Sequence, residues 1–306
     1  MLLLIVWTKL SSNLNSNNLK TIALTSFSLI AFAGNSVLCK LALEQDRLNA
    51  ASFTSIRLLS GIAILLLISQ VSNNKGNSIK KINWLSSSAL FLYAVTFSYA
   101  YISLDTGTGA LILFSAVQIT MILTNLILGN KLHFAEWIGM VTAFSGFIYL
   151  VQPGLTTPSL GGFILMSISG VAWGIYTLRG KKSKQPIHDS AVNFLYTLPF
   201  IIALLIIEFD NTKLSQQGII FAIASGAVTS GMGYTVWYMA VRRLSTLQAS
   251  VIQLLVPVIA AVGGVIFAGE IISTRLIVSS IAILGGILLV LLGQYFLRQK
   301  NTIKSK

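Results

Sequence analysis

Arg57 is the residue of this sequence with the clearest chemistry, because it is a permanent cation inside the apolar stretch 50–70. A guanidinium stays charged at physiological pH and presents a planar fork of N–H donors that suits carboxylate and phosphate groups. Arg57 could therefore bind an anionic solute, or it could form an ion pair with Glu44 or Asp46. It could also bridge helices or extend its charge towards water.

Amide side chains form a second group of candidates. Gln118 and Asn125 are seven residues apart and would share one face of a helix. Asn35 and Gln253 lie in two other apolar stretches. An amide that faces an apolar medium leaves its donors unsatisfied, so we expect these side chains to face the interior. Asn35, Gln118 and Gln253 are candidates for substrate binding, and hydrogen bonding between helices is the alternative.

Aromatic side chains form a third group. Trp173 lies near the middle of its apolar stretch, and Tyr234 and Tyr238 share one helical face. Such rings can stack on planar or cationic solutes. The alternative is a belt of aromatic residues at the edge of a membrane. The aromatic candidates for a binding site are Tyr99, Trp173, Tyr176, Tyr234 and Trp237.

Pro257 and Glu270 are candidates for gating or coupling. Proline removes a backbone hydrogen bond, so Pro257 is expected to kink its helix and give a hinge or an exposed carbonyl. Glu270 falls at the end of the same apolar stretch. It could pair with Arg275 as a brace, or bind and release a proton if burial raised its pKa.

The elements that carry these residues are predicted to be membrane-spanning helices. Hydrophobic residues make up 55% of the 306 residues, charged residues only 9%, and the mean hydropathy is +0.81. Soluble domains carry about 25% charged residues, and a spanning helix needs about 20 apolar ones. The sequence predicts an all-α integral membrane protein with ten spans at 21–42, 50–70, 84–104, 108–129, 136–152, 160–179, 190–208, 217–240, 247–268 and 274–297.

The distribution of basic residues predicts the orientation of these spans. With a cytoplasmic N-terminus, 16 of the 21 Lys and Arg residues fall on the cytoplasmic side, four fall outside, and Arg57 lies within a span. Such a bias is typical of a multi-pass protein with both termini in the cytoplasm. It also explains the net charge of +13 without nucleic acid as a partner. We expect the cell (inner) membrane as the location.

An offset of 140 residues aligns three glycine pairs: Gly34 with Gly174, Gly129 with Gly269, and Gly146 with Gly286. The offset divides the chain into a first repeat at 20–152 and a second at 160–298. Each repeat holds five predicted spans, an odd number, so the second would be inverted. Residues 1–19 are expected to form a tail or an interfacial anchor, and residues 299–306 a basic tail.

Five short motifs stand out in the two repeats: Leu255-Val256-Pro257-Val258, Phe267-Ala268-Gly269-Glu270, Trp173-Gly174 with Tyr176, Gly34-Asn35 with Lys40, and the stretch from Phe53 to Arg57. These motifs resemble those of the EamA-like family of the drug/metabolite transporter superfamily. The resemblance implies ten helices in two repeats and a role in transport. The first repeat departs from it, with Val117 at the position matching Pro257 and Asn130 at the position matching Glu270.

The predicted function is a secondary transporter that moves a small organic metabolite, amino-acid-like or drug-like, by alternating access. A channel-like facilitator is the alternative, and a membrane enzyme is less favoured because no His-Glu-x-x-His motif occurs. We expect no cofactor and no metal, since Cys39 is the single cysteine and His133 and His188 are far apart. The expected partners are the solute, lipid and a possible second copy of the chain.

Overall fold

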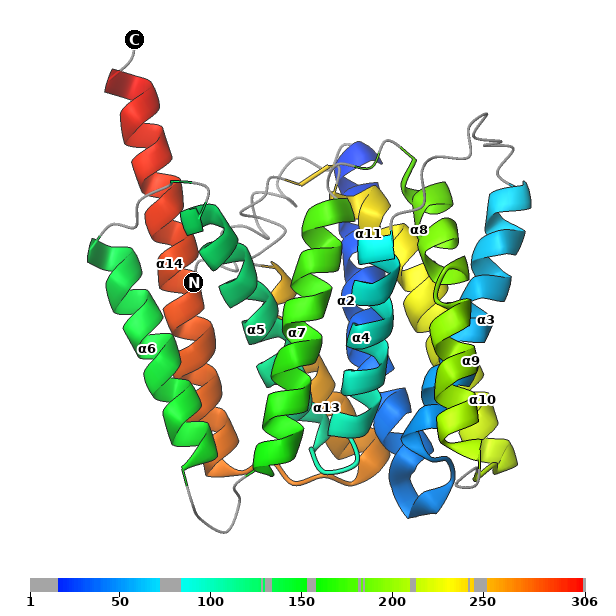
Figure 1. The fold of residues 1–306 in the computed structure, drawn as a ribbon. Coiled ribbons are helices and arrows are strands. Elements are labelled where there is room, and N and C mark those ends of the chain that lie inside the picture. The colour runs from blue at the N-terminus through cyan, green and yellow to red at the C-terminus, as the bar shows by residue number, and fades with distance from the viewer. Residues whose placement is uncertain are drawn as a thin grey trace.

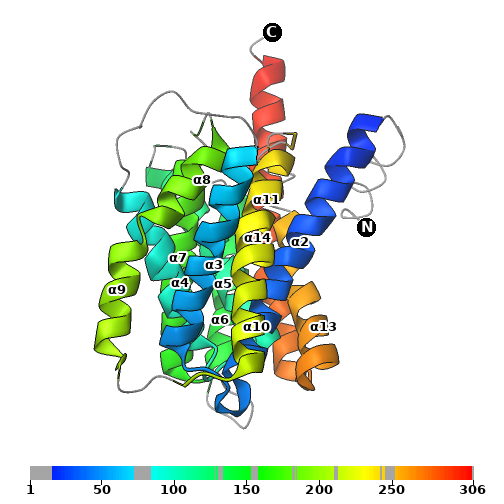
Figure 2. The ribbon, with the colours of Figure 1, turned by 90° about the vertical axis from the view of Figure 1, so that its right-hand side faces the viewer.

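The computed structural model describes residues 16–71, 84–127, 129, 134–152, 158–180, 183, 185–209, 213–241, 243–244 and 252–304. These residues form a bundle of helices that stand side by side (Figures 1 and 2). The one β-type pairing among them is an isolated bridge between Leu48 and Leu214. The predicted all-α class is confirmed.

The helices follow the predicted spans closely along most of the chain. The first part contains α2 (Ser16–Leu43), the short 3-10 helix η1 (Glu44–Asp46), α3 (Ala50–Val71), α4 (Trp84–Ala100), α5 (Thr106–Ile127) and α6 (Phe134–Val151). The second part contains α7 (Leu160–Gly180), α8 (Pro186–Leu195), α9 (Leu198–Ile207), α10 (Gln216–Ala224), the π-helix η3 (Ser225–Met232), α11 (Gly233–Val241), α13 (Val256–Ala268) and α14 (Thr274–Lys304).

Seven helical segments of the described residues are long and apolar enough to cross a membrane. They are Leu19–Asp46, Ala50–Gln70, Thr106–Thr124, Leu160–Gly180, Ile187–Ile207, Gln216–Val241 and Thr274–Gly293. Glu136–Val151 and Val256–Ala268 are apolar but shorter. The chain is therefore a multi-pass membrane protein, while the count of ten spans and the orientation of the termini stay predictions. Residues 1–15 of the expected N-terminal tail lie outside the described residues, and α14 continues through most of the expected C-terminal tail.

Two prolines occupy helix starts, and next to each of them a predicted span is interrupted. The helix predicted over 190–208 is interrupted at Tyr196 and Thr197, and Pro199 stands in the first turn of α9. Pro257 likewise stands in the first turn of α13. The described residues before it are helical at Ile252 and Gln253 and form a turn at Leu254 and Leu255, so the span predicted over 247–268 is interrupted next to Pro257, as expected of a proline that lacks the N–H. Both positions suit proline, because N–H groups in the first turn of a helix have no acceptor within the helix, so the lack of one breaks no hydrogen bond.

The glycine pairs of the 140-residue offset have matching environments in two cases. Gly129 and Gly269, which follow α5 and α13, both have a positive φ, of +88° and +64°. Gly146 and Gly286 both lie where α6 packs against α14. A Cβ on Gly146 would come within 2.8 Å of Ile283, and one on Gly286 would overlap the backbone of α6. Small residues let these two helices approach closely.

Candidate functional site

Arg57 on α3 lies in the interior of the bundle, with only 1% of its surface exposed. Its Nη2 donates hydrogen bonds to the hydroxyls of Tyr93 and Tyr234, at 2.8 and 3.1 Å. Its Nε donates to Ser230 Oγ at 3.1 Å. Its Nη1 is buried and has no hydrogen-bond partner among the described residues. The structure thus confines a permanent cation among neutral groups and leaves one end of its fork unused.

Two aromatic rings cover the guanidinium. The Arg57 Cζ atom lies 5.1 Å from the centre of the Tyr93 ring and 4.9 Å from that of Phe97, within the range of cation–π attraction. The predicted ion pair of Arg57 with Glu44 or Asp46 is not formed in the described part of the chain. Asp46 instead pairs with Lys213, at 2.9 Å on the surface. The guanidinium therefore keeps its charge in the interior without a carboxylate partner there.

Tyr93 on α4 connects Arg57 with Asn35 on α2. Its hydroxyl accepts a hydrogen bond from Asn35 Nδ2 at 3.2 Å and lies 3.2 Å from the hydroxyl of Tyr234. Tyr93 is not among the residues predicted for the site, although Tyr99 on the same helix is. The available signal was the spacing of Tyr93 and Phe97, which are four residues apart and share one helical face.

Arg57, Tyr93 and Asn35 form one side of a buried polar centre, and the π-helix η3 forms the other side. Ser225 Oγ donates to Asn35 Oδ1 at 2.6 Å, and Thr229 Oγ1 lies 3.4 Å from the same oxygen. Gly226 permits the close approach of η3 to α3, because a Cβ there would overlap the carbonyl oxygen of Arg57. A π-helix has a wider turn than an α-helix, and such turns are frequent at functional sites. Side chains of α4 and η3 therefore hold Asn35 and Arg57 in place by hydrogen bonds.

The aromatic candidates gather beside these polar groups. The Trp173 ring lies 4.6 Å from Tyr234, 4.8 Å from Tyr93 and 5.5 Å from Tyr176. Trp237 contacts Phe32, at 5.6 Å between ring centres. A cavity of about 10 Å³ lies among them, lined by Phe32, Asn35, Tyr93, Leu113, Phe114, Trp173 and Tyr234. That volume accommodates no more than a water molecule, so the centre is closed in this conformation.

The remaining candidates lie apart from this centre. Tyr99 donates its hydroxyl to Glu208, at 2.9 Å, and is only half-buried. Gln118 on α5 and Gln253 just before α13 are buried, but neither takes part in the contacts around Arg57 described above. The side chain of Asn125 lies outside the described residues, as does Asn130.

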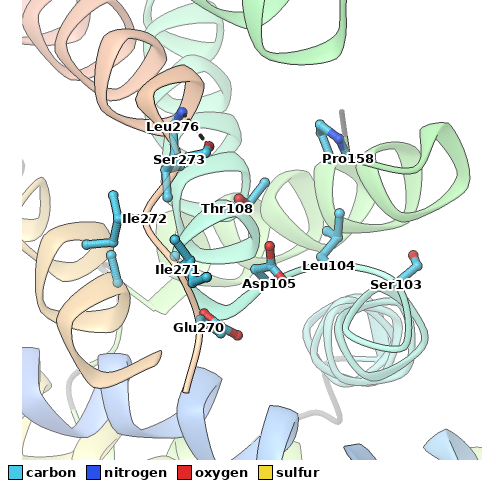
Figure 3. Close-up of a pocket in the computed structure, with 12 residues that line it drawn as sticks. Ser103, Leu104, Asp105, Thr108, Pro158, Glu270, Ile271, Ile272, Ser273 and Leu276 are labelled. Atoms are coloured by element: carbon cyan, nitrogen blue, oxygen red, sulfur yellow. Dashed lines mark hydrogen bonds between the residues drawn. The ribbon is translucent and has the colours of Figure 1, made fainter. Parts of the chain in front are cut away.

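A second, larger cavity of about 300 Å³ lies where α5 begins and α13 ends, shown in Figure 3. Asp105 and Thr108 line it from α5 and the connection before it, and Glu270 and Ser273 from the connection to α14. Figure 1 places these helix ends opposite the C-terminal end of α14. The cavity is a polar vestibule on that side of the bundle.

Glu270 lies in this vestibule and does not form the predicted brace with Arg275. Its Oε1 accepts hydrogen bonds from the backbone N–H and the hydroxyl of Thr106. Arg275 donates to the backbone carbonyl of Gln152 and lies over the ring of Tyr149. Glu270 therefore joins the end of α13 to the start of α5.

Within the described residues, no three His, Cys, Asp or Glu side chains cluster in a way that could hold a metal ion. His133 lies outside those residues, and Cys39 is fully buried on α2. The chemistry offered by the centre is that of binding, through one cation, hydroxyls, an amide and aromatic faces.

Comparison with known proteins establishes the family. The sequence profile of the EamA-like transporter family matches residues 19–152 and 160–292. The chain belongs to the EamA-like transporter family. Like that family it is a membrane transport protein with several apolar helices. The two matched stretches are separated by the connection between α6 and α7.

Relatives of this EamA-like chain agree with the assignment. An uncharacterised protein of Pseudomonas aeruginosa is 43% identical over 272 residues, which cover 89% of this chain and 94% of that protein. A probable amino-acid metabolite efflux pump of Salmonella typhimurium is 21% identical, over 64% of this chain and 70% of the pump. A solved crystal structure superposes with a TM-score of 0.59 at 15% identity, over 87% of this chain and 98% of that chain. That structure supports the fold alone.

Proposed function

We propose that the chain is a secondary transporter that carries a small organic metabolite with an anionic group across the cytoplasmic membrane by alternating access. The solute binds at the centre formed by Arg57, Asn35, Tyr93, Trp173 and Tyr234. The observation that carries the proposal is the buried guanidinium of Arg57, which has no carboxylate partner in the described interior and an unused Nη1 donor. A buried cation is costly unless it is paired, and a bound anion supplies the pair.

The solute class follows from the same centre and from a relative. The pump of Salmonella typhimurium is named for amino-acid metabolites, which are small and commonly carry a carboxylate. An arginine fork binds a carboxylate through two parallel hydrogen bonds. We therefore place the carboxylate of the solute on Arg57 and its organic part against Trp173 and Tyr234.

Alternating access is supported by the contrast between the two cavities. The centre is closed around about 10 Å³, whereas the vestibule near Glu270 has about 300 Å³. The solute would enter the centre only when helices separate on one side. Separation of α13 from α5 would open the vestibule side and break the contact of Glu270 with Thr106. Two inverted five-helix repeats, with ten spans and both termini in the cytoplasm, would provide the matching movement on the opposite side.

Counterflow in proteoliposomes tests the proposal. Vesicles that hold the purified protein are loaded with one unlabelled carboxylate, amino acid or amine at a time, and uptake of the same labelled solute is measured. A carrier should show faster uptake into loaded vesicles than into empty ones. Equal uptake into both would indicate a channel-like facilitator instead.

The Arg57→Gln variant tests the binding centre in the same assay. Loss of a charge-assisted fork removes about 1.5–3 kcal/mol of binding, so uptake at low solute concentration should fall about 10- to 100-fold. Arg275→Gln is the matched control, because Arg275 contacts Gln152 and Tyr149 away from the centre. Equal uptake by Arg57→Gln and the unaltered protein would show that Arg57 does not bind the solute.

A further inference from the structure

We propose that the solute is an organic monocarboxylate without an ammonium group, whose flat apolar body lies against the aromatic rings. This inference rests on the proposed function and narrows its solute class. It separates oxo acids and aryl-substituted carboxylates from the corresponding amino acids. Three properties of the centre support it, namely the balance of hydrogen-bond donors, the net charge and the shape of the walls.

The centre has more hydrogen-bond donors than acceptors. Arg57 brings five N–H groups, and Tyr93, Tyr234 and Ser230 bring one O–H each. The acceptors among these residues are the same three hydroxyl oxygens, and that of Tyr93 also receives a hydrogen bond from Asn35 Nδ2. Arg57 Nη1 accordingly finds no partner within the described residues. The missing component is an acceptor.

A carboxylate supplies that component and an ammonium group does not. An ionised carboxylate only accepts hydrogen bonds, through two oxygens, whereas an ammonium group only donates them. The amide oxygen of Asn35 could accept from an ammonium group, but both of its lone pairs are in use, since it already receives hydrogen bonds from Ser225 and Thr229. An amino acid would thus satisfy Arg57 with one end and leave donors without acceptors at the other.

The charge of the centre leads to the same conclusion. Arg57 is the charged residue of the centre, and none of the described residues that contact it or line the neighbouring cavity is Asp or Glu. A monoanion brings the net charge of the occupied centre to zero. A zwitterion leaves it at one positive charge and places its ammonium group near a cation, which is unfavourable where water is excluded.

The walls of the cavity favour a flat apolar body. Six of its seven lining residues are aromatic or aliphatic, and Asn35 is the exception. The Trp173 ring is inclined by 43° to that of Tyr93 and by 49° to that of Tyr234. Such rings would offer their faces to a planar group once the helices move apart, and aromatic pairs favour offset or tilted contacts.

Three solutes with one carbon skeleton separate the possibilities in the counterflow assay. They are 3-phenylpropanoate, which has only the carboxylate, phenylalanine, which has both groups, and phenethylamine, which has only the ammonium group. We expect 3-phenylpropanoate to exchange at least about tenfold faster than phenylalanine, because unpaired buried donors reject the wrong partner strongly. Phenethylamine should not exchange.

The outcomes separate this inference from the proposed function. Faster exchange of phenylalanine than of 3-phenylpropanoate would overturn the inference and leave the anion-binding carrier intact. Exchange of phenethylamine alone would overturn both. Failure of all three to exchange, with no carboxylate exchanging in the wider screen, would also overturn both.

The Asn35→Asp variant provides an independent test at the same centre. The new carboxylate would give the surplus donors an acceptor and would balance the charge of Arg57. We expect the preference to shift at least about tenfold from 3-phenylpropanoate towards phenylalanine. If Asn35→Asp lowered exchange of both solutes equally, the donor balance would not set the preference. Arg57→Lys, which keeps the charge but loses the fork, should retain the order of preference at lower rates.

Discussion

Glu270 holds Thr106 by two hydrogen bonds to one carboxylate oxygen, each 2.7 Å long. The two residues are 164 positions apart in the chain. Thr106 is the first residue of α5, and Glu270 follows α13 directly after Gly269. A carboxylate at the start of a helix satisfies a free N–H group and interacts favourably with the helix dipole. This contact joins the two halves of the chain on one side of the bundle, with one residue from each half.

Glu270→Gln should weaken that contact, because the amide lacks the charge that strengthens both hydrogen bonds. We expect the free energy of unfolding to fall by about 1–2 kcal/mol, measured from unfolding midpoints in detergent. Glu208→Gln is the control, since the Glu208 carboxylate is half-buried like that of Glu270 but accepts its hydrogen bond from the Tyr99 hydroxyl and not from the start of a helix. A larger loss in Glu208→Gln than in Glu270→Gln would contradict the role of Glu270 as the residue that joins α13 to α5.

Tyr93→Phe should affect both stability and solute binding. The hydroxyl that it removes contacts Arg57, Asn35 and Tyr234 in the interior. Loss of a buried hydroxyl with several partners costs about 1–3 kcal/mol, and Arg57 would also lose part of its positioning. Tyr99→Phe on the same helix should cost less than 1 kcal/mol, about the value of one partly exposed hydrogen bond. Equal midpoints for the two variants would show that Tyr93 is not the connecting residue.

Gly226→Ala should separate α3 from η3. The added methyl group would overlap the backbone oxygen of Arg57 and Ser60 Oγ, and backbone cannot move aside as a flexible side chain can. We expect a large loss of folded protein, scored by the monodisperse fraction in size-exclusion chromatography. Gly285→Ala is the matched control because a Cβ there meets nothing within 4 Å. Similar yields for both variants would mean that the close approach of the two helices is not required.

The topology can be tested around a single span. Lys213 precedes the continuous helical segment Gln216–Val241 and Arg243 follows it, and both side chains are exposed. Cys39 is fully buried and should stay unreactive, so the natural chain serves as the background. A membrane-impermeant maleimide added to intact cells should label Lys213→Cys and spare Arg243→Cys. The opposite pattern would show that the orientation of the chain is the reverse of the predicted one. Labelling of both variants would show that Gln216–Val241 does not cross the membrane.

The sequence predicted the positions of the helices well because apolar length is a direct requirement of the membrane. It also predicted Arg57, Asn35, Trp173 and Tyr234 as site residues, and the structure brings these four together. A polar or ionisable side chain within an apolar span is costly, so its presence there indicates a function. It did not distinguish Tyr93 from Tyr99. Both tyrosines lie in one helix that is apolar on all faces. Because lipid and the bundle interior both favour apolar residues, the hydrophobic pattern does not show which face of this helix points inwards.

The pairing of Glu270 could not be predicted either. The sequence places Arg275 five residues away and Thr106 164 residues away, and proximity in the chain favoured the wrong partner. The identity of the partner depends on how α13 packs against α5, which is a property of the folded bundle. Pro257 was likewise assigned to a helix interior because the apolar stretch continues on both sides of it.

The π-helix η3 has a consequence for how this chain can vary among its relatives. A π-helical turn contains about one residue more than an α-helical turn, so removal of one residue from Ser225–Met232 would restore a regular α-helix. Such a deletion would rotate the segment before it by about 100° relative to Tyr234. Ser225 and Ser230 could not then both reach Asn35 and Arg57. A substitution within this segment would therefore act only on the contacts of that one residue, whereas a change of its length would displace Ser225 and Ser230 together and abolish the site.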